Sequence, residues 1–586
     1  MRILLLFLVV FTISCNNPKP TVTPNFKTTF ETSEGKETAT YMEVIQFYNH
    51  LDASYKSIKL LEMGNTDSGF PLHLVIYNPS GEFDFEKIRS KKRVLLVNNG
   101  IHPGESDGID ASMLFLRDLA SNKINAPENT VVAVIPVYNI GGALNRNSTS
   151  RTNQNGPKSY GFRGNAQNYD LNRDFIKSDT RNAKSFAQLF HVVQPDVFID
   201  NHVSNGADYQ YAITHLFTQH NKLGGALGTY IENQMMPELE QKLEKKNWPI
   251  TPYVNVFNSV PENGFSQFKD SPRYSTGYTT LFNTLGMMVE THMLKPYKQR
   301  VEGTYEIMNS MLEIVEKDAE TIAQLRADTF NSNPKENTWP IQWSLDSEKF
   351  KTLNFKGYEG KYVDSELTGL RRLQYDTTKP FEKPVKYNNT FVPSSTITVP
   401  EAYVIPQGWH RITELLELNN VAIIPLKKDT LLTVESYKIK DYKTRTSPYE
   451  GHYAHYNTTV STTTKDLLFR AGDKLVYTNQ TAFRYIIETL EPSATDSFFN
   501  WNFFDTILQQ KEGFSPYVWE DLALAYLNKK PDLKREFNAK KANDSSFSKS
   551  WYAQLDWIHK RSPNYEKAHL QYPIYRISKK IKKATL

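Results

Sequence analysis

The stretch that decides the fold is "VLLVNNGIHPGESDG", residues 94–108. Its first part, Val94 to Val97, is a continuous apolar run, which is typical of a strand buried on both faces of a sheet. The run ends in an Asn-Asn-Gly sequence, and a Pro-Gly pair then separates His102 from Glu105. In open α/β sheets, functional sites lie beyond the carboxyl ends of the strands. The stretch therefore predicts a buried strand that presents a histidine and a glutamate at a site.

The bulk composition is that of a soluble globular protein. For the function, it argues only against one class of partner, nucleic acid. The 586 residues are 39% hydrophobic, 23% charged and 13% aromatic, with a net charge of +5. This length suffices for two or three domains. Because the net charge is small and the basic residues are scattered, we expect no nucleic-acid partner.

The first residues predict export. Met1-Arg2 precedes "ILLLFLVVFTI", an apolar run of signal-peptide length that ends just before Cys15, the only cysteine. This junction resembles the lipobox of bacterial lipoproteins, so we expect residues 1–15 to be a signal peptide with Cys15 as the lipidation site. We expect an outer-membrane-anchored lipoprotein of the cell envelope whose only membrane contact is this anchor. The alternative is an ordinary cleaved signal and a periplasmic or secreted protein.

Composition and hydrophobic pattern divide the rest of the chain into four segments. Residues 16–40 are rich in Pro, Thr and Asn and are predicted to be a linker. In residues 41–330, apolar β-branched runs alternate with amphipathic helical patterns, ending in a long helix at about 300–328. This predicts an α/β domain whose sheet is covered by helices on both faces. A small β-rich domain is expected at 341–490, where Thr, Tyr and Val are frequent, and a helical C-terminal region at 491–586.

Three residues at predicted strand ends have the chemistry of a metal site. His202 ends the run "FIDNH", so it is expected at the same sheet edge as His102 and Glu105. Two histidines and one glutamate leave one coordination position open, as catalytic zinc requires. Asp200 and Asn201 are placed to orient an imidazole. Taken alone, strand-end histidines are more often structural residues, and that alternative stays open at this point.

A second motif adds a family resemblance. The segment "GFRGNAQNYDLNRDF", residues 161–175, contains "DLNRDF", which is close to "DLNRNF" of the zinc metallocarboxypeptidases of the carboxypeptidase A type. The order of the candidate residues also resembles that family, from His102 to a late strand "GMMVETH". The resemblance covers roughly residues 40–325, about half of the chain. It implies a zinc carboxypeptidase-like fold, with a mixed sheet and helices on both faces, and one Zn²⁺ per chain.

The resemblance implies a role for each candidate residue. Carboxypeptidase A itself uses a His₂Glu zinc set, so the ligand set and the resemblance are one argument. The implied metal ligands are His102, Glu105 and His202. The implied general base is Glu290, and the implied cation that stabilises the oxyanion is Arg163. The implied residues that bind the substrate carboxylate are Asn172 and Arg173. For the tyrosine that closes over the bound residue, we prefer Tyr274 to Tyr278. The uncharged stretch between Tyr278 and Glu290 favours neutral terminal residues.

Three functions compete at this stage. The leading one is an exported, zinc-dependent metallocarboxypeptidase that hydrolyses the C-terminal bond of peptides with a free carboxylate. The second is a zinc amidase or peptidase acting on cell-wall peptides or N-acyl amino acids. The third is a binding lipoprotein whose catalytic machinery is vestigial. Retention of Glu290 argues against the third, because a binding protein needs no general base.

Overall fold

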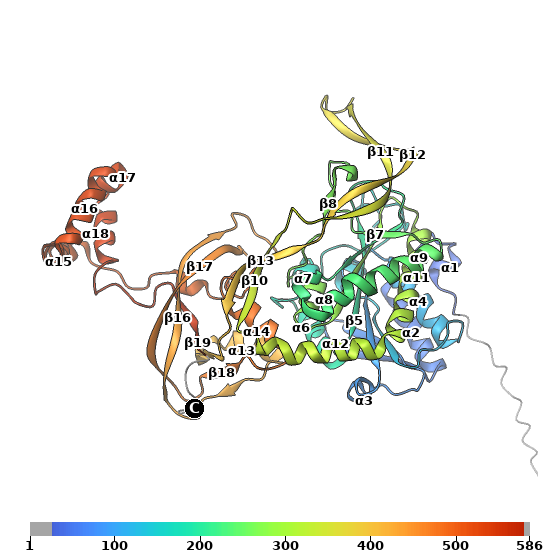
Figure 1. The fold of residues 1–586 in the computed structure, drawn as a ribbon, viewed down its shortest axis with the longest axis horizontal. Coiled ribbons are helices and arrows are strands. Elements are labelled where there is room, and N and C mark those ends of the chain that lie inside the picture. The colour runs from blue at the N-terminus through green and yellow to red at the C-terminus, as the bar shows by residue number, and fades with distance from the viewer. Residues whose placement is uncertain (1–25, 579–586) are drawn as a thin grey trace, which may run out of the picture.

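The computed structural model describes residues 26–578, so the predicted signal peptide and Cys15 lie outside the described residues. An eight-stranded mixed sheet occupies the right-hand half of Figure 1. Its strand order is β1-β2-β4-β3-β5-β9-β6-β7. The strands are β1 (Ile58–Asn65), β2 (Pro71–Tyr77), β3 (Arg93–Asn98), β4 (Thr130–Ile135), β5 (Val197–Ser204), β6 (Ile213–Phe217), β7 (Ile250–Pro252) and β9 (Leu285–His292).

The centre of this sheet is parallel and buried. β4, β3, β5 and β9 run parallel to one another, so their carboxyl ends share one edge. Every residue of β4 and β5 is buried, as expected for parallel strands covered on both faces. The apolar run at 94–97 is β3, and the turn with His102 and Glu105 follows it at that edge. The predicted α/β fold with a mixed sheet is confirmed.

Helices cover both faces. One face packs against α2 (Tyr41–Ser54), α4 (Asp107–Ala120), α9 (Met236–Lys245) and α11 (Tyr297–Lys317) in one hydrophobic cluster. α2 begins at a capping box in which the Thr40 hydroxyl and the Glu43 carboxylate satisfy each other's backbone N–H groups. The other face packs against α6 (Arg181–Val193) and α10 (Ser275–Thr280).

The C-terminal region, defined here as residues 338–577, completes the second face. Its residues Tyr403, Ile412, Tyr485 and Trp501 belong to the same hydrophobic cluster as Leu96 of β3. The catalytic domain and the C-terminal region therefore share one hydrophobic core and are not independent domains joined by a linker.

Three sheets build this region. A two-stranded sheet pairs β10 (Thr338–Leu345) with β13 (Phe391–Thr398). The long hairpin of β11 (Lys351–Asp364) and β12 (Arg371–Asn388), which projects at the top of Figure 1, pairs with β8 (Phe265–Ser266). The six-stranded sheet has the order β15-β18-β14-β19-β16-β17. Its strands are β14 (Ala402–Ile405), β15 (Ile424–Pro425), β16 (Thr430–Thr444), β17 (His455–Phe469), β18 (Lys474–Tyr477) and β19 (Gln571–Ile577), with α13 (His410–Leu418) and α14 (Phe483–Leu490) packed nearby.

The structure differs from the sequence-based expectation at three places. Within the expected linker 16–40, residues 26–40 hold the short helix α1 (Thr29–Thr32), and Phe30 is buried in the same hydrophobic cluster as α2. The region expected to be helical, 491–586, holds α15 (Pro516–Asn528), α16 (Pro531–Asn543), α17 (Ser545–Ser548) and α18 (Trp551–His559), but 571–577 returns as β19 inside the six-stranded sheet. β19 pairs with both β14 and β16, which propensity alone does not reveal. The long helix expected at 300–328 is two helices, α11 and α12 (Ala319–Ser332), which meet at Asp318.

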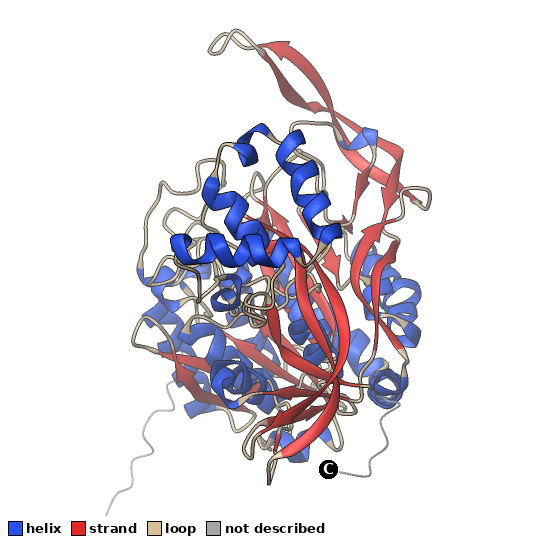
Figure 2. Cartoon of the chain, turned by 90° about the vertical axis from the view of Figure 1, so that its left-hand side faces the viewer, coloured by secondary structure: helices blue, strands red, loops and turns tan. Residues whose placement is uncertain are grey.

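The helices α15 to α18 form a separate small bundle, at the far left of Figure 1 and in front in Figure 2. They enclose their own cluster around Trp519 and Leu555. Among residues 26–578, no helix combines the length and apolar character needed to cross a membrane.

Candidate active site

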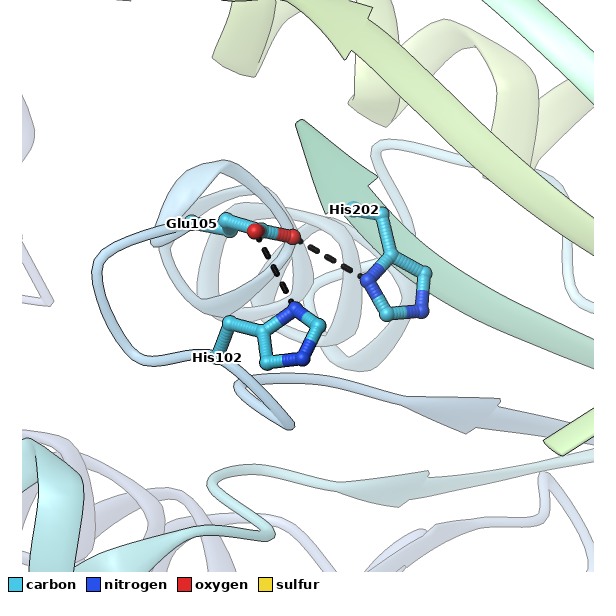
Figure 3. A group of neighbouring side chains, drawn as sticks. All are labelled: His102, Glu105 and His202. Carbon is cyan, nitrogen blue, oxygen red and sulfur yellow. Dashed lines mark hydrogen bonds and ion pairs between the residues drawn. The ribbon is translucent and has the colours of Figure 1, made fainter. Parts of the chain in front are cut away.

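The carboxyl ends of β3 and β5 bring the predicted ligands together. His102 and Glu105 are the ends of a turn closed by a 2.7 Å hydrogen bond from the Glu105 N–H to the His102 carbonyl. His202 lies on β5, the direct neighbour of β3. One ligand atom from each of the three residues lies within 4.8 Å of the others, and all three side chains are buried. Figure 3 shows both imidazole rings turned toward the Glu105 carboxylate.

Each imidazole presents one nitrogen inward and the other to an aspartate. The Nδ1 atoms of His102 and His202 lie 3.1 and 3.0 Å from the Glu105 oxygens. The outer Nε2 atoms lie 2.9 Å from Asp170 and 2.9 Å from Asp200. A carboxylate that accepts from the outer N–H fixes the tautomer and leaves the inner nitrogen free to bind a metal. Of the two predicted orienting residues, Asp200 has this role.

Asn201 instead points away from the histidine, and its amide donates to Asn99 at 2.8 Å. The Ser275 hydroxyl and the Asn98 amide both donate to Asp200. Asp200 is thereby held by two donors besides His202, in a site where its charge is fully buried.

The residues present fit a zinc ion. The Nδ1 atom of His102 is buried and makes no hydrogen bond to any described residue, although it faces Glu105. A buried nitrogen without a partner is unusual in a native protein, and a metal ligand explains it. Burial alone would raise the pKa of Glu105, but the adjacent His102 imidazole and Arg151 guanidinium hold that pKa well below its usual range. Glu105 is therefore an anion, and two imidazoles with one carboxylate suit Zn²⁺.

Glu290 stands beside these ligands on β9. The parallel register pairs Glu290 directly with His202. The pKa of Glu290 is raised to about 7: burial raises it most, the nearby His202 and Arg163 lower it, and the charges of Glu105 and Asp200 raise it. The same site thus holds one carboxylate of low pKa and one of raised pKa.

The motif "DLNRDF" places the predicted substrate-binding residues around Asp170. The Arg163 guanidinium donates to Asp170 Oδ2 from Nε at 3.0 Å and lies 3.6 Å from Glu105. Asn172 is buried, and its Oδ1 accepts from the Ser275 N–H at 3.1 Å. Arg173 stacks on the Tyr274 ring, with its guanidinium carbon 4.6 Å from the ring centroid.

The two candidate tyrosines lie in different environments. Tyr274 lines the cavity, and its ring contacts Phe268 edge to face at 5.1 Å. Tyr278 is completely buried, and its hydroxyl donates to Asn419 at 2.6 Å. His292 is also buried, with Nε2 2.8 Å from the Ala207 carbonyl, which is a structural role.

One cavity of about 320 Å³ collects the candidate residues. Its polar lining includes His102, Glu105, His202, Glu290, Arg163, Asn172, Arg173 and Tyr274. The remaining wall is uncharged and comes from Leu216, Tyr253, Phe257, Phe268 and Met288 together with residues 203–205 and 255. Only Met288 comes from the stretch that the sequence favoured for selecting the terminal side chain.

Sequence reasoning assigned no role to several residues of the site. Asp170 lies inside the motif, two residues before Asn172, so the sequence could have indicated that it belongs to the site. Arg151 donates to the ligand Glu105 at 2.6 Å, and Ser275 joins Asp200 to Asn172, but neither stands in a recognisable pattern. Their roles depend on tertiary proximity alone.

Comparisons with known proteins agree with this site. The profile of the family described as "Zinc carboxypeptidase" matches residues 44–201. The chain is 22% identical over 440 residues to Carboxypeptidase 2 of Trichophyton equinum, covering 72% of this chain and 76% of the relative. The same figures hold for Carboxypeptidase 2 of Trichophyton rubrum.

Solved structures with similarity to the chain include a metallo-carboxypeptidase from Burkholderia cenocepacia, with 14% identity, a TM-score of 0.36, and coverage of 48% of this chain and 70% of that one. Carboxypeptidase A from Helicoverpa armigera has 12% identity, a TM-score of 0.37, and coverage of 48% and 74%.

The family profile covers β3, the turn with His102 and Glu105, and the "DLNRDF" motif. His202 directly follows the matched segment, and the structure brings it to His102 and Glu105. The motif and the buried His₂Glu cluster both agree with the matched family. The chain therefore carries a catalytic domain of the zinc carboxypeptidase family and is a metallopeptidase.

Proposed function

We propose that the protein is an exported metallocarboxypeptidase that removes the C-terminal residue of peptides, with Glu290 as general base. The observation that carries this proposal is the cavity of about 320 Å³, because it holds the His₂Glu cluster, Glu290 and a carboxylate-binding set together. An endopeptidase has no terminal carboxylate to bind, so a guanidinium and an amide beside the His₂Glu cluster favour an enzyme that acts at a free chain end.

Zinc would be held by His102, Glu105 and His202, and when bound it lowers the pKa of a water molecule and polarises the scissile carbonyl. Glu290, paired with His202 across β5 and β9, takes the proton from the water and returns it to the leaving amine. Arg163 stabilises negative charge that develops on the carbonyl oxygen, where a fixed cation is most effective.

The terminal carboxylate of the substrate is bound by Asn172 and Arg173. A guanidinium matches a carboxylate in planar, bidentate geometry, which sets the distance from the chain end to the scissile bond. Tyr274 stacks on Arg173 and closes the pocket on that side. Since the rest of the wall is uncharged, we propose that the pocket accepts neutral terminal side chains.

The experiment uses the protein without residues 1–15, with its zinc content measured, and a mixed peptide library read by mass spectrometry. We expect loss of single C-terminal residues, abolished by a chelator and restored by added zinc. The same peptides with C-terminal amides are the control and should remain intact. Bound zinc with untouched free peptides would overturn the proposal in favour of cell-wall peptides or N-acyl amino acids.

Export and lipidation of Cys15 are part of the proposal and rest on the sequence of residues 1–15. Expression of the full chain in a bacterial host, followed by mass spectrometry of the mature N-terminus, tests both. Diacylated Cys15 supports a lipoprotein, cleavage without a lipid supports a secreted or periplasmic protein, and an intact Met1 contradicts export.

A further inference from the structure

The C-terminal region contacts the substrate-binding residues through the turn between β16 and β17. At this turn Glu450 adopts a left-handed backbone conformation with φ +49°. Its carboxylate accepts the backbone N–H of Asp170 at 2.8 Å. Gly451 follows at φ +78°, a backbone conformation that favours glycine, and a Cβ there would lie 2.6 Å from the Tyr169 hydroxyl, so the turn packs closely against Tyr169. A residue 280 positions along the chain thus fixes the segment that carries Arg173.

A second carboxylate holds the neighbouring loop. Asp496, whose side chain is fully buried, accepts the backbone N–H of Arg273 at 3.0 Å and the Arg273 Nε at 2.9 Å. The guanidinium also lies over the rings of Trp501 at 4.9 Å and Tyr449 at 5.7 Å. Arg273, the residue directly before Tyr274, thereby anchors this loop to the C-terminal region.

These two anchored segments meet over the cavity. Arg173 stacks on Tyr274, and the N–H of Ser275 donates to Asn172, so each segment supports the other. Neither segment is part of a long helix or a strand, because 171–173 is a single 3-10 turn and Tyr274 precedes the short helix α10. Loops of this kind need external contacts to hold a precise geometry.

We infer that the C-terminal region is a structural part of the substrate clamp, with Glu450 and Asp496 as positioning residues for Arg173 and Tyr274. The inference rests on the proposed carboxypeptidase function for its kinetic consequence. Neither carboxylate lines the cavity, so both act through the residues that they hold. Since the clamp binds the terminal carboxylate in the ground state and in the transition state alike, loosening it should raise KM more than it lowers kcat.

The first test compares Glu450→Ala with Glu450→Gln in the protein that lacks only residues 1–15. The glutamine amide oxygen can still accept the Asp170 N–H, so the conservative variant should remain close to wild type. The alanine variant should raise KM about tenfold, the scale of a lost hydrogen bond to a charged group. Zinc content should not change. Hydrogen exchange of peptides covering 168–174 should become faster in the alanine variant only.

The second test uses Asp496→Asn, with Glu488→Gln as the matched control. Glu488 is a buried carboxylate of the C-terminal region that lies 3.6 Å from Lys222 of the catalytic domain and is not among the residues that line the cavity. We expect a raised KM and faster exchange at 270–276 for the Asp496 variant, and wild-type values for the control. If Asp496→Asn fails to fold, the Glu450 series decides.

Unchanged KM and unchanged exchange in Glu450→Ala would overturn the inference. An equal rise of KM in the Glu488 control would also overturn it, because the effect would then come from general loosening of the interface. If wild-type protein cleaves no peptide, the proposed function fails, and the hydrogen-exchange comparison alone still decides whether Glu450 and Asp496 hold the clamp.

Discussion

At the scale of single residues, the site gives two neighbouring carboxylates, Glu105 and Glu290, pKa values that are shifted in opposite directions. Glu105 contacts two histidines and Arg151, so its charge is compensated and its pKa is low. Glu290 faces the same cavity, where burial and the charges of Glu105 and Asp200 outweigh His202 and Arg163 and raise its pKa to about 7. Pairs of titratable groups whose environments push their pKa values apart mark acid–base sites. The pattern supports the proposed roles of metal binding for Glu105 and proton transfer for Glu290.

Replacing the carboxylate of Glu290 by its amide tests this assignment. Glu290→Gln should lower kcat by a factor of about 10² to 10⁴, the usual contribution of a general base. Zinc content should be unchanged, because the metal contacts assigned to His102, Glu105 and His202 remain. Steady-state kinetics and metal analysis provide the measurements. Glu62→Gln, at an exposed position of β1, is the control, and a rate near wild type for Glu290→Gln would contradict the base assignment.

At the scale of elements, the site depends on how closely α4 packs on β5. Gly108, in the first turn of α4, faces Asn201 and Asn99, and a Cβ there would lie 2.4 Å from atoms of both residues. Asn201 directly precedes His202, and Glu105 lies three residues before Gly108. The absence of a side chain at Gly108 therefore lets the strand and the helix bring their ligands together.

An alanine at this position should separate the two elements. Gly108→Ala should destabilise the protein by about 1–3 kcal/mol, the cost of overpacking a tight interior, and weaken zinc binding as Glu105 moves relative to His202. Denaturant unfolding and competition with a zinc chelator measure the two effects. Gly408→Ala is the matched control, because a Cβ there meets no atom within 4 Å. Equal behaviour of the two variants would show that α4 can shift without cost.

At the scale of the whole molecule, the catalytic domain and the C-terminal region form one folding unit with an appended bundle. One hydrophobic cluster runs from Leu96 and Phe198 of the large sheet to Phe483 and Trp501 of the C-terminal region. The bundle of α15 to α18 has a separate core. Burial of apolar surface is worth about 25 cal/mol per Å², so loss of the shared face is costly.

A chain that ends at residue 336 should consequently be insoluble or only partly folded. Its sheet would expose the apolar face that the C-terminal region now covers. Soluble yield and binding of a hydrophobic dye provide the measurements. Replacing residues 515–560 by a short Gly/Ser linker is the control and should leave a folded protein. A soluble, cooperatively unfolding fragment would contradict the shared-core interpretation.

Acid should weaken the interface at Asp179. Burial would raise its pKa, but the hydrogen bond from His452 of the C-terminal region and the charge of buried Lys177 lower that pKa to about 2. A folded-state pKa below the unfolded value of about 3.9 stabilises the protein above pH 4. The stabilisation is lost as the pH falls from about 4 to about 2.

Asp179→Asn removes this contribution. The variant should be less stable than wild type by about 2 kcal/mol at neutral pH, and the difference should shrink toward pH 2. Unfolding curves of both proteins across pH 2–7 provide the measurement. A difference that is independent of pH would show that the carboxylate is not charged at this interface.

The sequence by itself determined the catalytic fold and the chemistry of its centre. Those features depend on local patterns: an apolar run marks a buried strand, a turn follows it, and one motif carries Asn172 and Arg173. The tertiary structure decided which residues surround them. It placed Tyr274 in the cavity and Tyr278 in the core, brought Arg151 to Glu105, and carried Glu450 to Asp170. Such contacts join residues far apart in the chain and leave no periodicity or spacing in the sequence, so only the folded packing reveals them.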